Sequence, residues 1–169
     1  MGLLSAESLQ RIDREVAKYP ADQKQSAVMS ALRIAQDQHG WLPNELMEEV
    51  ANYLGMPPVW VYEVATFYNM YNLKPMGKHK VVICTNLPCA LSGAVEAGEH
   101  LKRKLGVDGY NETSANGCVT LKEGECFGAC GDAPVLIVDN KRMCSHMTRE
   151  RLDALVDELS AAPATPGGE

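Results

Sequence analysis

Two short stretches, CTNLPC at residues 84–89 and CFGAC at residues 126–130, decide how this chain folds. Each begins and ends with a cysteine, so the chain carries two close cysteine pairs that lie far apart in sequence. The pairs can form one site only if the fold between them brings them together. Four converging thiolates in a chain without a secretory signal usually hold a metal ion or an iron–sulfur cluster. The two stretches therefore predict a thiolate site that the tertiary fold assembles.

The spacing within the two pairs discriminates among thiolate sites. Four residues separate Cys84 from Cys89, and three separate Cys126 from Cys130. Structural zinc sites most often repeat Cys-x2-Cys, and a thioredoxin-type dithiol needs the same short spacing. Plant-type ferredoxins need Cys-x4-Cys-x2-Cys with a distant fourth cysteine. The spacing argues against these patterns and leaves a zinc-stabilised interaction module open as an alternative to an iron–sulfur site.

The residues around the cysteines suit a 2Fe–2S cluster, which is negatively charged when four thiolates bind it. Cys89 is expected at the start of a helix, where unpaired N–H groups favour an anion. Gly128 and Gly131 flank Cys130 and let the backbone wrap closely around sulfur. Pro134 then sets the exit from the loop. These features favour the cluster over zinc.

The other cysteines and the histidines are not expected to be ligands. Cys118 and Cys144 have no close cysteine partner, so we expect buried or half-buried thiols. The histidines do not cluster with the cysteine pairs by spacing, which argues against a Rieske-type site; they are His39, His79, His100 and His146. Three disulfides would also use six cysteines. However, residues 1–83 contain none, and a chain this long can bury a core without such crosslinks.

Composition limits the possible classes of protein. The chain has 169 residues, 46% of them hydrophobic, which allows one domain or one domain with a helical annex. A net charge of −6 and a pI near 5.2 argue against binding to nucleic acid or to an anionic membrane surface. No apolar run approaches the roughly 20 residues of a membrane-spanning helix, so we expect no direct membrane insertion. The N-terminus lacks the pattern of a secretory signal, and no nucleotide-binding fingerprint is present.

Residues 1–74 are predicted to form an all-helical N-terminal domain. Apolar residues recur at helical spacing in four segments, residues 5–18, 22–39, 44–54 and 58–68. Ser5 and Asp22 are expected to cap the first two helices, and Gly40 and Gly55 to end the second and third. Residues 69–78 are expected to be a linker.

Residues 75–160 are predicted to form an α/β or α+β domain. Strands are expected at residues 79–85, 119–122, 135–139 and 142–145. One helix is expected to start at Pro88 and Cys89, with its inner face formed by Leu91, Ala94, Val95, Leu101 and Leu105. Residues 107–117 are expected to be a polar loop. Thr148 is expected to cap a last helix with the buried stripe Leu152, Leu155, Val156 and Leu159. Residues 161–169 are expected to be a disordered tail.

An aromatic run marks the end of the helical region. It consists of Trp60, Tyr62, Phe67, Tyr68 and Tyr71. These rings can form the core of the helical bundle, or they can form a docking face for a partner subunit. The sequence supports both interpretations equally.

Two longer motifs resemble a known family. GWLPNELMEEVANYLGMPPVWVYEVATFYNMY at residues 40–71 resembles the helical N-terminal half of the small iron–sulfur subunit, the E subunit, of bacterial complex I. The pattern Cys-x4-Cys followed by ECFGACGDAPV at residues 125–135 resembles the cluster motif of that family. The resemblance extends over about residues 26–159. It therefore covers most of the chain.

The resemblance implies a thioredoxin-like ferredoxin fold with a helical N-terminal extension. It implies a 2Fe–2S cluster bound by Cys84, Cys89, Cys126 and Cys130, and electron transfer in an NADH:quinone oxidoreductase whose active site this chain does not complete. It implies two partners, a larger flavin subunit that binds FMN and NADH and a larger iron–sulfur subunit. It also implies a cytoplasmic position at the periphery of the inner membrane. Related subunits of NAD-linked hydrogenases and formate dehydrogenases share the cluster motif and stay open as an alternative, as does a free-standing ferredoxin.

Overall fold

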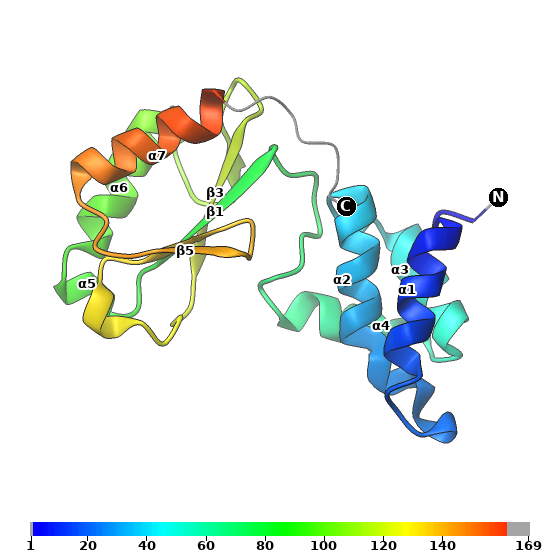
Figure 1. The fold of residues 1–169 in the computed structure, drawn as a ribbon. Helices are drawn as coiled ribbons and strands as arrows, with labels where there is room; N and C mark the ends of the chain where they lie inside the picture. Colours follow the sequence, from blue (N-terminus) through cyan, green and yellow to red (C-terminus); the bar gives the residue numbers. More distant parts are fainter. Residues whose placement is uncertain (1, 162–169) are drawn as a thin grey trace. The chain divides into compact units, whose positions relative to one another are not determined.

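The computed structural model describes residues 2–161, and the chain divides into two compact units between Pro75 and Met76 (Figure 1). The first unit is helical. Its elements are α1 (Ala6–Val16), the 3-10 helix η1 (Ala21–Ala27), α2 (Val28–His39), α3 (Asn44–Leu54) and α4 (Pro58–Phe67). The all-helical region expected before the cysteines is therefore confirmed.

The helical unit is held together by its apolar stripes and by local caps. Large side chains from all four α-helices and the α2–α3 turn are fully buried: Ile12, Leu32, Leu42, Leu46, Val50 and Val61. The hydroxyl of Ser5 accepts a 3.1 Å hydrogen bond from the N–H of Ser8 and caps α1, as predicted. Gly40 and Gly55 end α2 and α3 with φ of 82° and 68°, a conformation that favours glycine.

The second predicted helix begins later than expected. Residues 21–27 form η1, in which Gln23 leaves helical geometry with φ −116°, and α2 starts only at Val28. The prediction that Asp22 caps a continuous helix is therefore wrong. The stretch DQKQS at residues 22–26 has no apolar side chain to bury. Because tertiary packing of an apolar face supplies most helix stability, the regular helix begins where that face begins.

The aromatic run is divided between core and surface. Tyr71 is buried, and its hydroxyl donates a 2.9 Å hydrogen bond to the carbonyl of Met29. Burial raises the pKa of Tyr71 to about 12. Trp60 and Phe67 are exposed, and Phe67 packs edge-on against Tyr68 with ring centroids 4.9 Å apart. Tyr71 thus belongs to the core, whereas Trp60 and Phe67 are free to form a docking face.

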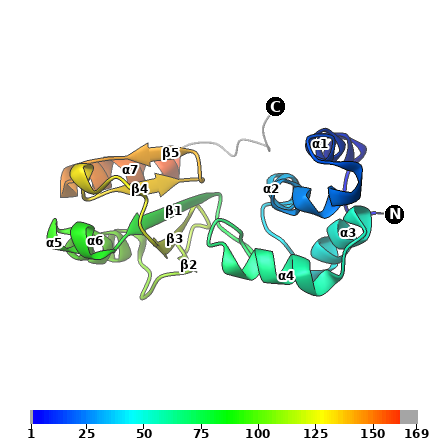
Figure 2. The ribbon, with the colours of Figure 1, turned by 90° about the horizontal axis from the view of Figure 1, so that it is seen from below.

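The second unit contains a five-stranded mixed sheet with the order β2-β3-β1-β4-β5. The strands are β1 (His79–Cys84), β2 (Glu112–Thr113), β3 (Val119–Gly124), β4 (Leu136–Val138) and β5 (Arg142–Cys144). β1 and β3 run parallel, and the other pairings are antiparallel. Figure 2 shows β2 next to β3 on one side of the unit and β5 next to β4 on the other. This mixed architecture confirms the predicted fold class.

Three helices accompany the sheet, α5 (Leu87–Leu91), α6 (Ala94–Leu105) and α7 (Arg149–Ala161). α6 and α7 lie side by side (Figure 1), and their apolar faces share one core with the central strands. Its fully buried large side chains are Val81, Ile83, Leu101, Leu121, Leu136 and Leu152. The predicted stripe of α7 is buried as expected.

The helix predicted from Pro88 onward is in fact two helices. Gly93, with φ of 92°, separates α5 from α6. As a result Leu91 and Val95, which were predicted on the inner face, are exposed, whereas Ala94, Leu101 and Leu105 are buried as predicted. The break changes the helical phase because a residue in the left-handed conformation redirects the chain.

Two smaller differences concern the edges of the predicted elements. β2 lies inside residues 107–117, which were predicted to be loop, because Thr113 and Glu112 pair with β3. Ala161, predicted to begin the tail, ends α7, and residues 162–169 lie outside the described residues. No helix within residues 2–161 combines the length and apolarity that crossing a bilayer requires.

Candidate functional site

The first cysteine pair is carried by regular secondary structure. Cys84 is the last residue of β1, and its N–H donates a 3.1 Å hydrogen bond to the carbonyl of Val135. Cys89 lies in the middle of α5, three residues after Asn86. Both cysteines are buried, each with 1% of its surface exposed. Their sulfur atoms therefore lie inside the protein and away from water.

The second cysteine pair lies on an exposed loop. Cys126 follows β3, and Cys130 opens the short 3-10 helix η2 (Cys130–Asp132). Gly128 adopts φ of 74°, and its N–H donates a hydrogen bond to Sγ of Cys126 at 3.4 Å. A backbone N–H directed at sulfur stabilises a thiolate. Hence the loop already points one donor at a predicted ligand atom.

Sheet register brings the two pairs to the same edge. β1 and β3 are parallel neighbours, and Cys84 is paired with Gly124, two residues before Cys126. Two side-chain hydrogen bonds join the residues that follow β1 to the end of β3 and to the loop after it. Thr85 donates to Glu123 at 2.5 Å, and Asn86 donates to Glu125 at 2.8 Å. The short segment between Cys84 and Cys89 is thus tied directly to the loop that carries the second pair.

The four thiols influence one another electrostatically. Burial raises the pKa of Cys89 to about 11, and a hydrogen bond with Cys84 and the charges of Cys84, Cys130 and Cys126 contribute to the increase. A hydrogen bond with Cys126 is the main cause that raises the pKa of Cys130. Such effects require close approach. Together with the register of β1 and β3, these effects place the four cysteines that the sequence singled out near one edge of the sheet.

A small apolar cluster surrounds Cys84 and Cys89. Cys84 and Cys89 are buried together with Ala94 and Val135, and the loop residues Phe127, Ala129 and Ala133 pack against them. Gly124 lies beneath this packing, because a Cβ built there would approach Cγ1 of Val82 to 2.6 Å. A side chain at this position would therefore force Val82 or Phe127 to move.

The donor set fits a 2Fe–2S cluster. Four cysteine thiols supply the ligands that this cluster requires, two from each stretch. Within each pair the two cysteines are close enough for one to raise the pKa of the other, Cys84 that of Cys89 and Cys126 that of Cys130. Within residues 2–161, no three His, Cys, Asp or Glu side chains surround a point that one metal ion would occupy. Burial raises the pKa of the Cys89 thiol above its ordinary value. The positive charge of a bound metal would favour the thiolate form that ligation requires.

The remaining cysteines lie elsewhere in the second unit. Cys118 and Cys144 are half-buried and pack against the core beneath α6 and α7, not against the cluster around Cys84. Burial raises the pKa of Cys144. The prediction that both are partly buried thiols is confirmed.

The histidines have partners other than the cysteines. His79 and His100 form 2.8 Å contacts with the carboxylates of Asp139 and Asp153. His146 lies closer to the site than sequence suggested, because its N–H donates a 2.7 Å hydrogen bond to the carbonyl of Asp132 in η2. No sequence spacing could reveal this contact, which depends on how the chain returns from β5 towards the cysteine loop.

Comparison with known proteins agrees with this geometry. Residues 12–160 match the model of the family described as thioredoxin-like 2Fe-2S ferredoxin. The chain belongs to this family. Among curated members with similar sequences, the second E subunit of the NADH-quinone oxidoreductase of Rhizobium meliloti is 41% identical over 90% of this chain and 89% of its own. The E subunit of the NADH-quinone oxidoreductase of Rickettsia felis is 43% identical over 86% of each chain.

A solved structure supports the fold of this thioredoxin-like 2Fe-2S ferredoxin. An NAD+-reducing NiFe-hydrogenase in the H2-reduced state superposes with a TM-score of 0.66 at 18% identity. The superposition covers 78% of this chain and 22% of the hydrogenase chain. At this identity the likeness concerns the fold alone. The fold of the present chain therefore also occurs as part of a larger chain.

Proposed function

We propose that this chain is the electron-transfer subunit of the NADH dehydrogenase module of an NADH-quinone oxidoreductase, with a 2Fe–2S cluster on Cys84, Cys89, Cys126 and Cys130. The observation that carries the proposal is the convergence of two distant cysteine pairs at one edge of the sheet. The family match and the two E-subunit relatives support it. When bound, the cluster accepts and gives up one electron at a time.

The residues of the chain divide the work of binding between them. Cys84 and Cys89 hold two ligand positions rigidly in a dry environment, because a strand end and a helix fix their backbones. Cys126 and Cys130 supply the other two from an exposed loop, where Gly128 adds an N–H directed at sulfur. Hydrogen bonds to sulfur and solvent exposure are two of the factors that set the reduction potential of such sites. The loop is therefore where this chain would tune that potential.

The exposed apolar residues near the site support a redox partner that docks there. Within residues 76–161, the exposed large apolar side chains are Leu87, Leu91, Val95 and Met143. Leu87 and Leu91 are 71% and 81% exposed and lie four residues apart on α5, on the helix face opposite Cys89. We propose that the flavin subunit, which binds FMN and NADH, contacts this surface within about one helix diameter of the cluster.

Further partners follow from the same proposal. Trp60 and Phe67 on the surface of the helical unit would be covered by a neighbouring subunit, since exposed aromatic rings are enriched in interfaces. The larger iron–sulfur subunit of the complex is the second proposed partner. With these subunits the chain would lie on the cytoplasmic side, at the periphery of the inner membrane.

The equivalent subunit of an NAD-linked hydrogenase or formate dehydrogenase is the second candidate. The fold likeness to the NAD+-reducing hydrogenase favours it. Sequence identity favours the first candidate, because both relatives described above are NADH-quinone oxidoreductase subunits at more than twice the identity. Purification of the native assembly distinguishes them, because a complex I module and a hydrogenase contain different catalytic subunits.

The decisive experiment is anaerobic purification of the full chain, followed by iron, sulfide and EPR measurements. We expect two irons and two acid-labile sulfides per chain, and an EPR signal after reduction but not before. The full chain mixed with its flavin subunit should become reduced by NADH. A colourless protein with one zinc and no sulfide would establish the zinc-module alternative. A loaded cluster that no flavin subunit can reduce would point to a free-standing ferredoxin.

A further inference from the structure

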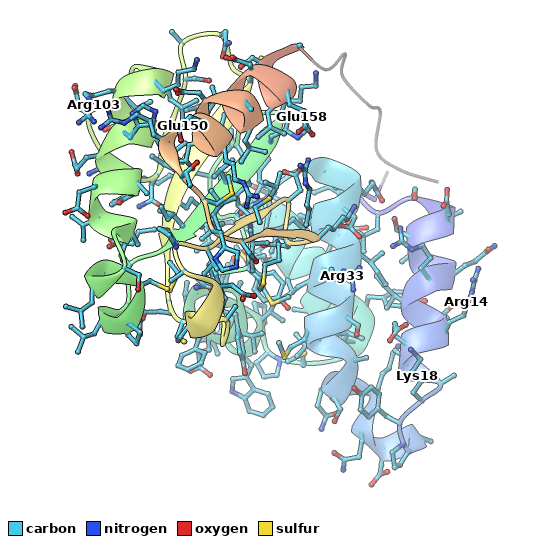
Figure 3. The ribbon with its side chains drawn as sticks, turned by 60° about the vertical axis from the view of Figure 1, so that its left-hand side comes forward. Arg14, Lys18, Arg33, Arg103, Glu150 and Glu158 are labelled. Atoms are coloured by element: carbon cyan, nitrogen blue, oxygen red, sulfur yellow. The ribbon has the colours of Figure 1, made fainter. Side chains whose placement is uncertain are left out.

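The helical unit carries a concentrated basic hollow that electron transfer does not require. It is an open depression of about 420 Å³ between α1 and α2, lined by Arg11, Arg14, Glu15, Lys18, Ser30, Arg33 and Ile34. Figure 3 labels Arg14 on α1, Lys18 just beyond its end and Arg33 on the neighbouring α2. We call this depression the α1–α2 hollow. It lies wholly within the helical unit and far in sequence from the cysteines.

The charge in the hollow contrasts with the rest of its unit. Residues 1–75 contain six Lys and Arg residues and nine Asp and Glu residues, so the unit is acidic. Four of those six basic residues, including all three arginines, line the hollow. Along α1 and its end the basic residues recur at positions 11, 14 and 18, which is the spacing of one helix face. The unit as a whole is acidic, but most of its basic side chains lie together in this hollow.

The side chain of Glu15 places one carboxylate in the hollow, among the basic residues that line it. Lys18 donates hydrogen bonds of 2.7 and 2.8 Å to the two oxygens of Glu15. This interaction is the main cause that lowers the pKa of Glu15, and Ser30 and Arg33 lower it further. Arg11 makes only a 3.5 Å contact with Asp37, and both of these side chains are about one third exposed or more. Such exposed pairs contribute little stability.

Positive charge therefore remains in excess within the hollow. Of its four cations, Lys18 is engaged by Glu15 and Arg11 is loosely held by Asp37. Guanidinium groups bind carboxylates through two parallel hydrogen bonds, and arginine is among the residues most enriched in interface hot spots. The arrangement suits two or more carboxylates presented together by a protein segment.

From this arrangement, and resting on the proposed function, we infer that the α1–α2 hollow is a docking site for an acidic segment of a neighbouring subunit in the assembly. Arg14 and Arg33 would hold carboxylates of that segment, and Lys18 with Glu15 would form the edge of the contact. The chain would then be attached at two places, by apolar contact beside the cysteines and by charge pairing on the helical unit. The second attachment would contribute to assembly and not to the rate of electron transfer.

The test measures rebinding of the loaded full-length chain to a complex depleted of it, over a range of salt concentrations. We expect Arg14→Glu and Arg33→Glu each to weaken binding about tenfold or more at low salt, as loss of a hot-spot residue does. The loss should shrink as salt rises, since salt screens exposed charges. The reduced-state EPR signal and the far-ultraviolet circular dichroism of both variants should equal those of wild type. If the chain bound no 2Fe–2S cluster, the EPR signal would be missing from wild type as well, which distinguishes failure of the proposed function from failure of the docking site.

Lys74→Glu is the matched control, because it makes the same change of charge in the same unit outside the hollow. It should change the affinity by less than about twofold, the small effect expected of a screened surface charge. Equal weakening by Lys74→Glu would mean that only net charge matters and would overturn the proposal. Unchanged binding by both arginine variants would overturn it as well.

Two other occupants give different results. Inorganic phosphate, titrated into the full chain while NMR signals of Arg14 and Arg33 are followed, would saturate at low concentration if the hollow were a small-anion site. Vesicles containing anionic lipid would retain the wild-type chain but not Arg33→Glu if the occupant were a membrane surface. Either result, together with rebinding that is insensitive to the arginines, would overturn the assignment to an acidic protein segment.

Discussion

The two cysteine pairs differ in how the protein holds them. Cys84 and Cys89 are buried and sit on a strand and a helix, whereas Cys126 and Cys130 are exposed on a loop with a left-handed glycine. Regular backbone hydrogen bonds fix the first pair before any metal binds. The second pair depends on packing and on a few side-chain hydrogen bonds. We therefore expect the half of the site that carries Cys84 and Cys89 to be rigid, and the half that carries Cys126 and Cys130 to be adaptable.

Serine substitutions should have the largest effects and should differ between the halves. Cys84→Ser should lose nearly all iron and sulfide, because a buried hydroxyl would have to become an alkoxide in an apolar environment. Cys126→Ser should retain some cluster with an altered spectrum, since water reaches this ligand position. Iron analysis and EPR of anaerobically reconstituted protein measure both. A normal EPR spectrum for either variant would contradict the proposed ligand set.

Gly124→Ala should have the next largest effect. Its Cβ would meet Cγ1 of Val82 at 2.6 Å and the ring of Phe127 at 2.8 Å, so the loop must move. We expect a loss of about 1–3 kcal/mol in the stability of the sheet unit, the usual cost of overpacking, and reduced cluster loading. Gly131→Ala is the matched control for the stability of the cluster-free protein, because a Cβ there meets no atom within 4 Å. Urea unfolding curves that are equal for the two variants would contradict the packing argument.

Asn86→Ala should have a moderate effect that reports the link between the halves. The variant removes the 2.8 Å hydrogen bond to Glu125. We expect a loss of about 1 kcal/mol in stability, and faster loss of the cluster to an iron chelator. The absorbance decay of the visible band measures the rate. If the rate matches that of wild type, the two loops do not depend on this hydrogen bond.

Cys144→Ser should have the smallest effect. Cys144 is half-buried at the end of β5 and packs against the α6–α7 core, away from Cys84. Iron content, sulfide content and the EPR spectrum should equal those of wild type, and stability should change by about 0.5 kcal/mol or less. Loss of iron from this variant would mean that a different set of four cysteines binds the cluster.

Local signals made most elements predictable. Neighbouring residues alone were enough to predict several features. These are the cap of α1 at Ser5, the ends of α2 and α3 at Gly40 and Gly55, and the buried stripe of α7. The errors arose where packing decided the outcome. Gly93 redirected a run that reads as one helix, and the polar stretch before Val28 did not join α2.

The sequence by itself determined which four cysteines stand out, because pair spacing and the glycines beside the second pair are written in it. Only the tertiary structure decided that β1 and β3 lie side by side in register, which brings Cys84 opposite Gly124. It also decided that one pair is buried and the other exposed, and that four basic residues along two helices share one hollow. The physical reason is that strand pairing and helix packing join residues distant in the chain, and no local pattern records those contacts.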